Sequence, residues 1–184
     1  MLEPKEMDAI DEFEEVLNSI TGLFVDSHDA YALLQAKVEL DAEGKDWDSP
    51  IYYGDGSVGA ANHVAHTTTI AERISRNADC VGNSTFVGNM ALVMIYSYWE
   101  DHFRAQIANA KGVTKDVLKS DVMGDIRWLR QSIVHHRGIA TDEVGNCKVL
   151  TWFAKGDEIF LNEQMFLQMI SHARAYLDEL RSGN

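Results

Sequence analysis

The stretch that decides the fold is residues 85–110, which read TFVGNMALVMIYSYWEDHFRAQIANA. It is the most apolar long segment of the chain and predicts one long helix. At about 100° per residue, a helix carries two neighbouring apolar faces here. Because both faces are largely apolar, we expect this helix to be central and packed on more than one side. One face holds Leu92, Tyr96, Trp99 and Phe103; the adjacent face holds Met90, Val93, Ser97, Glu100 and Arg104.

Apolar residues at three- and four-residue spacing predict further helices on both sides of this segment. Gly22 either ends or merely weakens the first, and Asp26 or Ser27 is a plausible N-cap for the second. The last is predicted to begin after an N-cap at Asn162 and to point Phe166, Met169, Ile170, Ala173, Tyr176, Leu177 and Leu180 inward. The predicted ranges are 5–24, 26–42, 63–76, 114–138 and 163–181.

Three segments interrupt the helical pattern. Residues 44–62 contain Pro50 and four glycines and predict a long loop, and 77–84 predict a turn. Residues 147–161 contain two strand-like runs around Lys155–Asp157 and predict a β-hairpin before the last helix. The sequence therefore predicts a single, mostly all-α domain over 1–184: an up-and-down bundle of about four or five helices with one small hairpin.

Composition limits the classes of function. The chain has 184 residues and a formal net charge of −13, from 16 basic and 29 acidic residues. Such a chain is repelled by nucleic acid at long range, so a nucleic-acid function requires a local basic patch. The acidic N-terminus lacks a signal-peptide core and no apolar run approaches membrane-spanning length. We therefore expect a cytoplasmic protein with no membrane partner, in which Cys80 and Cys147 are reduced thiols.

A local basic patch is found at Arg127–Gly138, which reads RWLRQSIVHHRG. On a helical wheel Ile126, Leu129 and Ile133 form a narrow apolar stripe. The next arc, about 140° wide, holds Arg130, Val134, Arg127, Gln131 and His135 in that order. His136 falls on the far edge of the apolar stripe, so the geometry favours His135 as the functional histidine.

The run Arg130-Gln131-Ser132-Ile133-Val134-His135 resembles the Arg-x4-His signature of the HEPN superfamily. The continuation His136–Ala140 and the upstream run Tyr98–Arg104 are also similar to bacterial HEPN-like proteins, so the resemblance covers roughly residues 85–140. It implies a helical bundle that pairs as a homodimer, with the motif helices facing each other. Many such proteins are metal-independent endoribonucleases that act as toxins or in antiphage and stress defence. Others are inactive and serve as dimeric binding or scaffold modules.

The expected roles follow from RNA chemistry. Cleavage by the 2′-hydroxyl needs a base, an acid and positive charge on the phosphate. His135 is the predicted acid/base and Arg130 the predicted phosphate-stabilising group. Because these two positions lie about 140° apart on one helix, we expect two copies to bring Arg130 of one chain near His135 of the other. The expected supporting or RNA-binding residues are Gln131, Arg127, Glu100, His136 and Arg137. The expected partners are RNA, a second copy and an antitoxin or regulator; no cofactor is expected.

Other interpretations of these residues remain open. Basic residues near a helix C-terminus complement the helix dipole, and Gly138 is a natural C′ residue. Glu100 has the spacing for an ion pair with Arg104, which we favour over a role in the active site. His63 and His66, at i and i+3 on an expected helix, suggest with His102 a metal-dependent hydrolase as a third hypothesis.

Overall fold

The computed structural model describes residues 8–54, 64–78 and 82–182. The predicted fold class is confirmed: over these residues the structure is 68% helical with a small two-stranded antiparallel sheet. It comprises two compact units. The first is formed by residues 1–25 and 86–184, and the second by residues 26–85.

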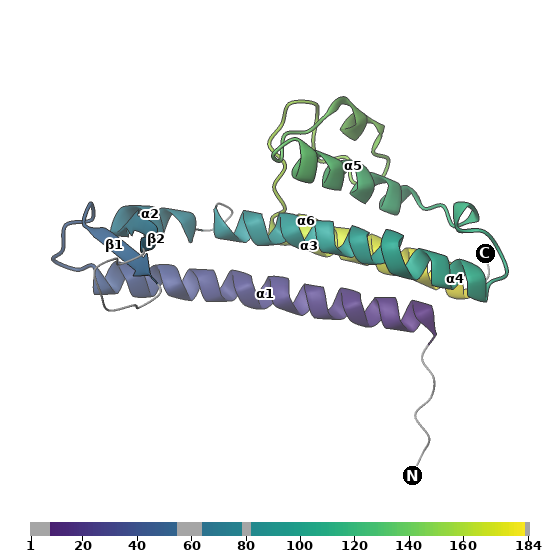
Figure 1. Cartoon of the computed structure of the whole chain (residues 1–184), viewed down its shortest axis with the longest axis horizontal. Coiled ribbons are helices and arrows are strands. Elements are labelled where there is room, and N and C mark those ends of the chain that lie inside the picture. Colours follow the sequence, from purple (N-terminus) through teal and green to yellow (C-terminus); the bar gives the residue numbers. More distant parts are fainter. Residues whose placement is uncertain (1–7, 55–63, 79–81, 183–184) are drawn as a thin grey trace, which may run out of the picture. The chain divides into compact units, whose positions relative to one another are not determined.

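The first unit is a helical bundle built on the segment that we expected to be central. The N-terminal part of α1 (Ala9–Asp41), α3 (Asn83–Tyr98), α4 (Arg104–Ala110) and α6 (Glu163–Ser182) run side by side (Figure 1). A turn of π-helix, Trp99–Phe103, joins α3 to α4, so 85–110 is helical throughout. The α5 helix, Asp121–His135, completes the unit after a short 3-10 turn at Lys115–Val117.

The core of this unit confirms the central position of α3. Leu92, Ile95 and Trp99 are buried, and Phe13 of α1 packs against Trp99 with ring centroids 5.7 Å apart. At Gly88 a Cβ atom would lie 2.8 Å from the carbonyl oxygen of Leu161, so glycine allows the close approach of these segments.

The prediction for the last helix is also confirmed. Its N-cap Asn162 accepts a hydrogen bond from the Met165 amide at 2.9 Å, and all seven residues expected to point inward are buried.

The predicted break between 5–24 and 26–42 does not exist, because α1 is one helix of 33 residues. An exposed glycine inside a helix costs about 1 kcal/mol. Two residues after Gly22, the buried Phe24 ring stacks on Phe166 of α6 at a centroid distance of 4.1 Å. This packing continues the helix beyond the glycine, so neither Asp26 nor Ser27 is an N-cap.

The second unit contains the sheet, in a place where none was expected. Strand β1 (Pro50–Gly54) lies inside the predicted loop 44–62, and β2 (Val64–Thr69) occupies the start of the predicted helix 63–76. The strands pair antiparallel, with Tyr53 opposite His66. The helix α2 (Ile70–Arg76) begins only after Thr69, which forms a capping box with Glu72. Helical spacing did not reveal that the helix starts only after this cap. The three consecutive threonines at 67–69 favour a strand before it.

The hairpin predicted at 147–161 is not formed. The described backbone there has no strand and makes only an isolated bridge between Ile139 and Glu158. The reason is the buried carboxylate of Asp125 on α5, which accepts hydrogen bonds from the amides of Lys148, Val149 and Leu150 at 2.7–3.0 Å. Amides that bind a carboxylate cannot also form a strand ladder.

Across the described ranges, no helix combines the length and the hydropathy that crossing a membrane requires.

Candidate functional site

The helix α5 presents the predicted basic residues on its outer face. Its first turn is capped by Ser120, whose hydroxyl accepts from the Met123 amide at 3.4 Å. The predicted stripe of Ile126, Leu129 and Ile133 is buried, which confirms the orientation of the helix. On the other side Arg127, Val134 and His135 are exposed, and Arg130 and Gln131 are half-buried.

The end of α5 differs from the expected glycine cap. His136 is the C-cap, and its amide donates to the Ser132 carbonyl at 3.0 Å. Arg137, with φ of 56°, takes the left-handed C′ position that was predicted for Gly138. Gly138 follows with φ of 80°, and its amide also donates to Ser132, at 3.1 Å. Two successive residues in the left-handed region therefore end the helix, with arginine in the position that glycine usually takes.

Arg130 and His135 come together within one chain. Arg130 Nη1 lies 3.3 Å from His135 Nε2. The wheel angle of about 140° between the two positions therefore does not keep their side chains apart. The wheel angle describes Cα directions, whereas a long arginine side chain reaches around the helix to a residue in its last turn. Because a guanidinium only donates, Nε2 of His135 is the acceptor in this contact.

A second group of charges lies on the helix preceding the motif. Glu100, in the π-helical turn, accepts from Arg104 at 2.7 Å and from Lys115 at 3.2 Å. The predicted Glu100–Arg104 ion pair is therefore confirmed, and Lys115 adds a second partner. Burial raises the pKa of the Glu100 carboxyl, but the two cations outweigh it and hold that pKa below its ordinary value.

Tyr96 on α3 lies within electrostatic range of Glu100 and of the arginines on α4 and α5. Burial, followed by the charge of Glu100, raises the pKa of its phenol, while Arg127, Arg104 and Arg130 act in the opposite direction. The charges of arginines on α4 and α5 therefore reach this half-buried ring. Between 104 and 137 the sequence has seven Lys and Arg residues and three acids, within a chain of net charge −13. Segment 104–137 of the first unit is therefore locally basic within an acidic chain.

The remaining predicted residues lie at the edge of this group. His136 and Arg137 are exposed at the end of α5. A hydrogen bond from Thr141 is the largest cause that lowers the pKa of the Glu143 carboxyl, and His136 contributes to the same shift. His136 therefore lies within electrostatic range of Glu143. Gln131 is half-buried beside Arg130 in the sequence of the helix.

Sequence reasoning missed Asp125. It is 2% exposed and lies next to Ile126 on the buried side of α5. An acid inside an apolar stripe is the signal that points to it, because a buried carboxylate requires partners. Those partners are backbone amides 23–25 residues later, which periodicity does not reveal.

The residues of the metal hypothesis are not arranged as predicted. His66 lies on strand β2 instead of a helix, and His63 lies outside the described residues. Within the described part of the chain, no three His, Cys, Asp or Glu side chains gather where they could hold a metal ion. Cys147 is a free, half-buried thiol whose pKa is raised by burial to about 12, and Cys80 lies outside the described residues.

Comparison of the chain with protein-family models, with curated proteins and with solved structures finds no match.

Proposed function

We propose that the protein is a metal-independent endoribonuclease whose reaction centre is the Arg130–His135 pair. The observation that carries the proposal is the 3.3 Å contact of these two side chains at the exposed end of α5. It combines a phosphate-binding fork and an imidazole in one place, within the basic segment 104–137 of an acidic chain. The Arg-x4-His spacing and its resemblance to the HEPN superfamily give the pair its expected chemistry.

In this mechanism the RNA supplies its own nucleophile. When Arg130 turns from His135 to the phosphate, the freed Nε2 of a neutral His135 takes the proton from the 2′-hydroxyl, which attacks the adjacent phosphorus, and the 5′-oxygen leaves. Arg130 donates to the phosphate oxygens as negative charge develops on them. The products are a 2′,3′-cyclic phosphate and a 5′-hydroxyl. Arg127 lies one turn before Arg130 and extends the positive surface along the strand.

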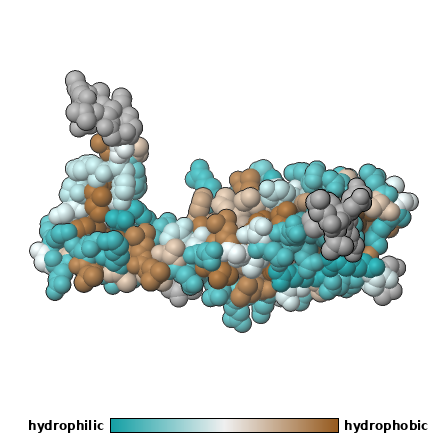
Figure 2. Space-filling view, turned by 90° about the horizontal axis from the view of Figure 1, so that it is seen from below, coloured by the Kyte–Doolittle hydropathy of each residue, from teal (hydrophilic) through white to brown (hydrophobic). Residues whose placement is uncertain are grey.

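The leaving 5′-oxygen needs a proton, and we propose that a second copy supplies the acid as part of a homodimer. Hydrophobic side chains at the surface of the first unit support association, because large exposed apolar areas mark interaction sites. Leu23, Phe86 and Met94 are 59, 64 and 43% exposed. Figure 2 shows hydrophobic patches among the hydrophilic ones on the face that it presents.

The test is RNA cleavage in EDTA by the wild type and by the single variants Arg130→Ala and His135→Ala. We expect each variant to lose at least about a hundredfold in rate, the usual scale of a lost acid/base or oxyanion-stabilising group. The matched controls Arg174→Ala and His102→Ala remove the same side chains elsewhere on the first unit and keep full activity. Unchanged cleavage by both motif variants would contradict the proposal.

The reaction products distinguish a nuclease from a binding module, and a mixing experiment distinguishes a pair within one chain from a pair between chains. Cleavage that leaves 2′,3′-cyclic phosphate ends is expected. RNA binding without cleavage, lost in Arg130→Ala, would instead identify a non-catalytic binding module. Mixed Arg130→Ala and His135→Ala chains are expected to stay inactive, because the pair forms within one chain. Recovery of activity on mixing would show that the pair forms between chains.

The resemblance also suggests a toxin or a defence nuclease that an antitoxin or regulator restrains. Expression of the wild type is then expected to arrest growth, and His135→Ala is expected to abolish this effect. Equal growth with both proteins would argue against a toxin role without bearing on cleavage in vitro.

A further inference from the structure

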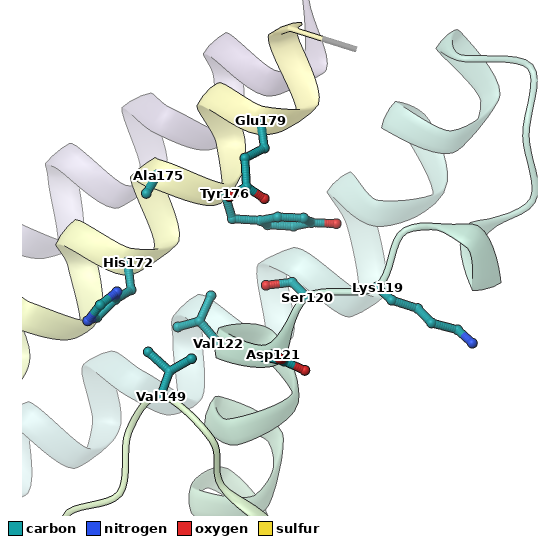
Figure 3. Close-up of a pocket in the computed structure, with 9 residues that line it drawn as sticks. All are labelled: Lys119, Ser120, Asp121, Val122, Val149, His172, Ala175, Tyr176 and Glu179. Atoms are coloured by element: carbon teal, nitrogen blue, oxygen red, sulfur yellow. The ribbon is translucent and has the colours of Figure 1, made fainter. Parts of the chain in front are cut away.

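Two apolar hollows adjoin each other in the first unit, where the N-terminal part of α1 runs along α3 (Figure 1). Their volumes are about 550 and 560 Å³, and Met94 and Tyr98 line both. Together they form one recess along residues 12–23 and 93–103, which we call the α1–α3 groove. By contrast, the pocket between the start of α5 and α6 has polar walls that carry groups of both charges (Figure 3). The chemical steps of the proposed reaction do not use the groove, so it requires its own explanation.

The shape of the groove fits a helix. On α1 the lining residues extend from Glu12 to Leu23 at three- and four-residue spacing, which corresponds to about three helical turns or 17 Å. Leu23, Met94 and Tyr98 are 59, 43 and 41% exposed, so apolar surface remains open along this length. An amphipathic helix binds such a groove through apolar side chains that recur on one of its faces. The two hollows on either side of Met94 and Tyr98 can each accept one of these side chains.

The rim of the groove is acidic. Glu12 and Glu15 line it on α1 and Asp101 lines it beyond α3, and none of the described residues that line it is Lys or Arg. Residues 8–25 contain five acids and neither Lys nor Arg. Within the described ranges Glu12, Glu15 and Asp101 form no ion pair, so their charges are free to attract a basic partner.

The π-helical turn Trp99–Phe103 is an independent indication of a binding surface. Such turns are rare and are frequently found at functional sites. Here the turn contributes Asp101 and His102 to one hollow and Phe103 to the other. The residue shared between the hollows, Met94, has a flexible and polarizable side chain of the kind that is common on surfaces that bind helices.

Charge decides between two occupants of the groove. Leu23 and Met94 belong to the exposed apolar surface that supports association, so a second copy is one candidate. Two copies paired through this groove would, however, bring one acidic rim against another, and juxtaposed like charges disfavour an interface. A helix that carries lysines and arginines beside its apolar face neutralises the rim instead. The homodimer of the proposed nuclease is then expected to use other exposed apolar side chains, such as Phe86.

We propose that the α1–α3 groove binds a basic amphipathic helix of a partner protein. The apolar side chains of the helix fill the two hollows beside Met94 and Tyr98, and its lysines and arginines pair with Glu12, Glu15 and Asp101. This inference goes beyond the proposed nuclease function and does not depend on it. Binding of the helix and cleavage of RNA can therefore fail separately.

The test uses the full chain and a labelled peptide of about 18 residues, made of leucine and lysine with the leucines at helical spacing. Fluorescence anisotropy measures binding, and we expect a Kd of about 10 μM or tighter. One control peptide has the same composition with leucine and lysine alternating, so that a helix has no apolar face. The other has glutamate in place of lysine and is repelled by the rim. Both are expected to bind at least about tenfold more weakly.

Two variants test the apolar contacts. Leu23→Ala and Met94→Ala are each expected to weaken binding about tenfold, the scale of a lost interface anchor. Because both side chains are exposed, the Tm of the free protein is expected to stay unchanged. The matched control Leu167→Ala removes a leucine that is 41% exposed in a separate hollow on α6, and it leaves the affinity unchanged.

A double variant tests the charges. Glu12→Gln combined with Glu15→Gln is expected to weaken binding at low salt and to reduce its dependence on salt, because screening acts on the pairs that this variant removes. The control Glu163→Gln removes an exposed acid on α6, beside Leu167, and is expected to change neither property.

The proposal is overturned if the amphipathic peptide fails to bind at concentrations up to about 1 mM, or if the alternating peptide binds as tightly. It is also overturned if Leu23→Ala and Met94→Ala both leave the affinity unchanged. Sedimentation tests the second copy: a homodimer that Met94→Ala dissociates, together with no binding of the peptide, would assign the groove to that copy instead.

Discussion

The two ends of α5 use charge in opposite ways. At the start of the helix, the Asp125 carboxylate is buried and binds three backbone amides that hold residues 148–150 in place. At the end, Arg137 is exposed in a left-handed conformation, and Arg130 contacts His135. The first set of charges maintains the fold, whereas the second contributes little to it. Substitutions at the two ends are therefore expected to separate stability from activity.

The largest effect on stability is expected for Asp125→Ala. The change leaves three amides without their acceptor, at about 1 kcal/mol each, so we expect a loss of about 3 kcal/mol in the free energy of unfolding. Urea denaturation measures this loss. The control Asp121→Ala removes an exposed ion pair with Lys148 and costs less than about 1 kcal/mol. Equal stability of the two variants would contradict the contrast between buried and exposed acids on this helix.

A smaller effect is expected at Arg137, at the other end of the helix. A β-branched residue is strained at a φ of 56°, so Arg137→Val is expected to lower the unfolding free energy by about 1–2 kcal/mol. Arg137→Gly is expected to cause no loss, because glycine adopts this conformation without strain. Thermal unfolding of the two variants provides the comparison. If both are equally stable, the left-handed turn is not formed in solution.

The smallest effect is expected for Glu100→Gln, which removes the acid facing the basic residues. Its side chain is 26% exposed, so the pairs with Arg104 and Lys115 are expected to contribute less than about 1 kcal/mol at pH 7.

The pH dependence of this contribution has a defined sign. Because the pKa of Glu100 is lowered in the folded protein, the contribution is fully present above its ordinary value of 4.5. It is lost as the pH falls through the lower, folded value. Unfolding free energies of the wild type and Glu100→Gln are therefore expected to differ at pH 7 and to converge in acid. A difference that grows on acidification would contradict the ion pairs.

Parts of the molecule with strong helical periodicity were predictable. The inward residues of α6 and the buried stripe of α5 follow directly from three- and four-residue spacing, since each helix buries one face. The candidate site was predictable to the same extent: the sequence places Arg130 and His135 on an exposed arc of α5. Their contact was not predictable, because it depends on side-chain reach at the last turn of the helix.

Unexpected structure was found where the sequence offered two local solutions. Residues 64–69 carry apolar spacing that fits the start of a helix, yet they pair with β1 because Thr69 and Glu72 form the cap one turn later. Residues 148–153 have strand propensity, yet their amides are taken by Asp125. In both cases a partner distant in sequence, or a cap, outweighs local preference.

The sequence by itself determined the helical class, the central helix, the buried faces of α5 and α6, and the basic segment in an acidic chain. These features depend on periodicity and composition, which are local. Only the tertiary structure decided the continuity of α1 through Gly22, the sheet at β1 and β2, the left-handed Arg137 and the Arg130–His135 contact. The first two depend on which distant groups meet, and the last two depend on backbone conformation and side-chain reach at the end of α5. Neither is encoded in the spacing of apolar residues along the chain.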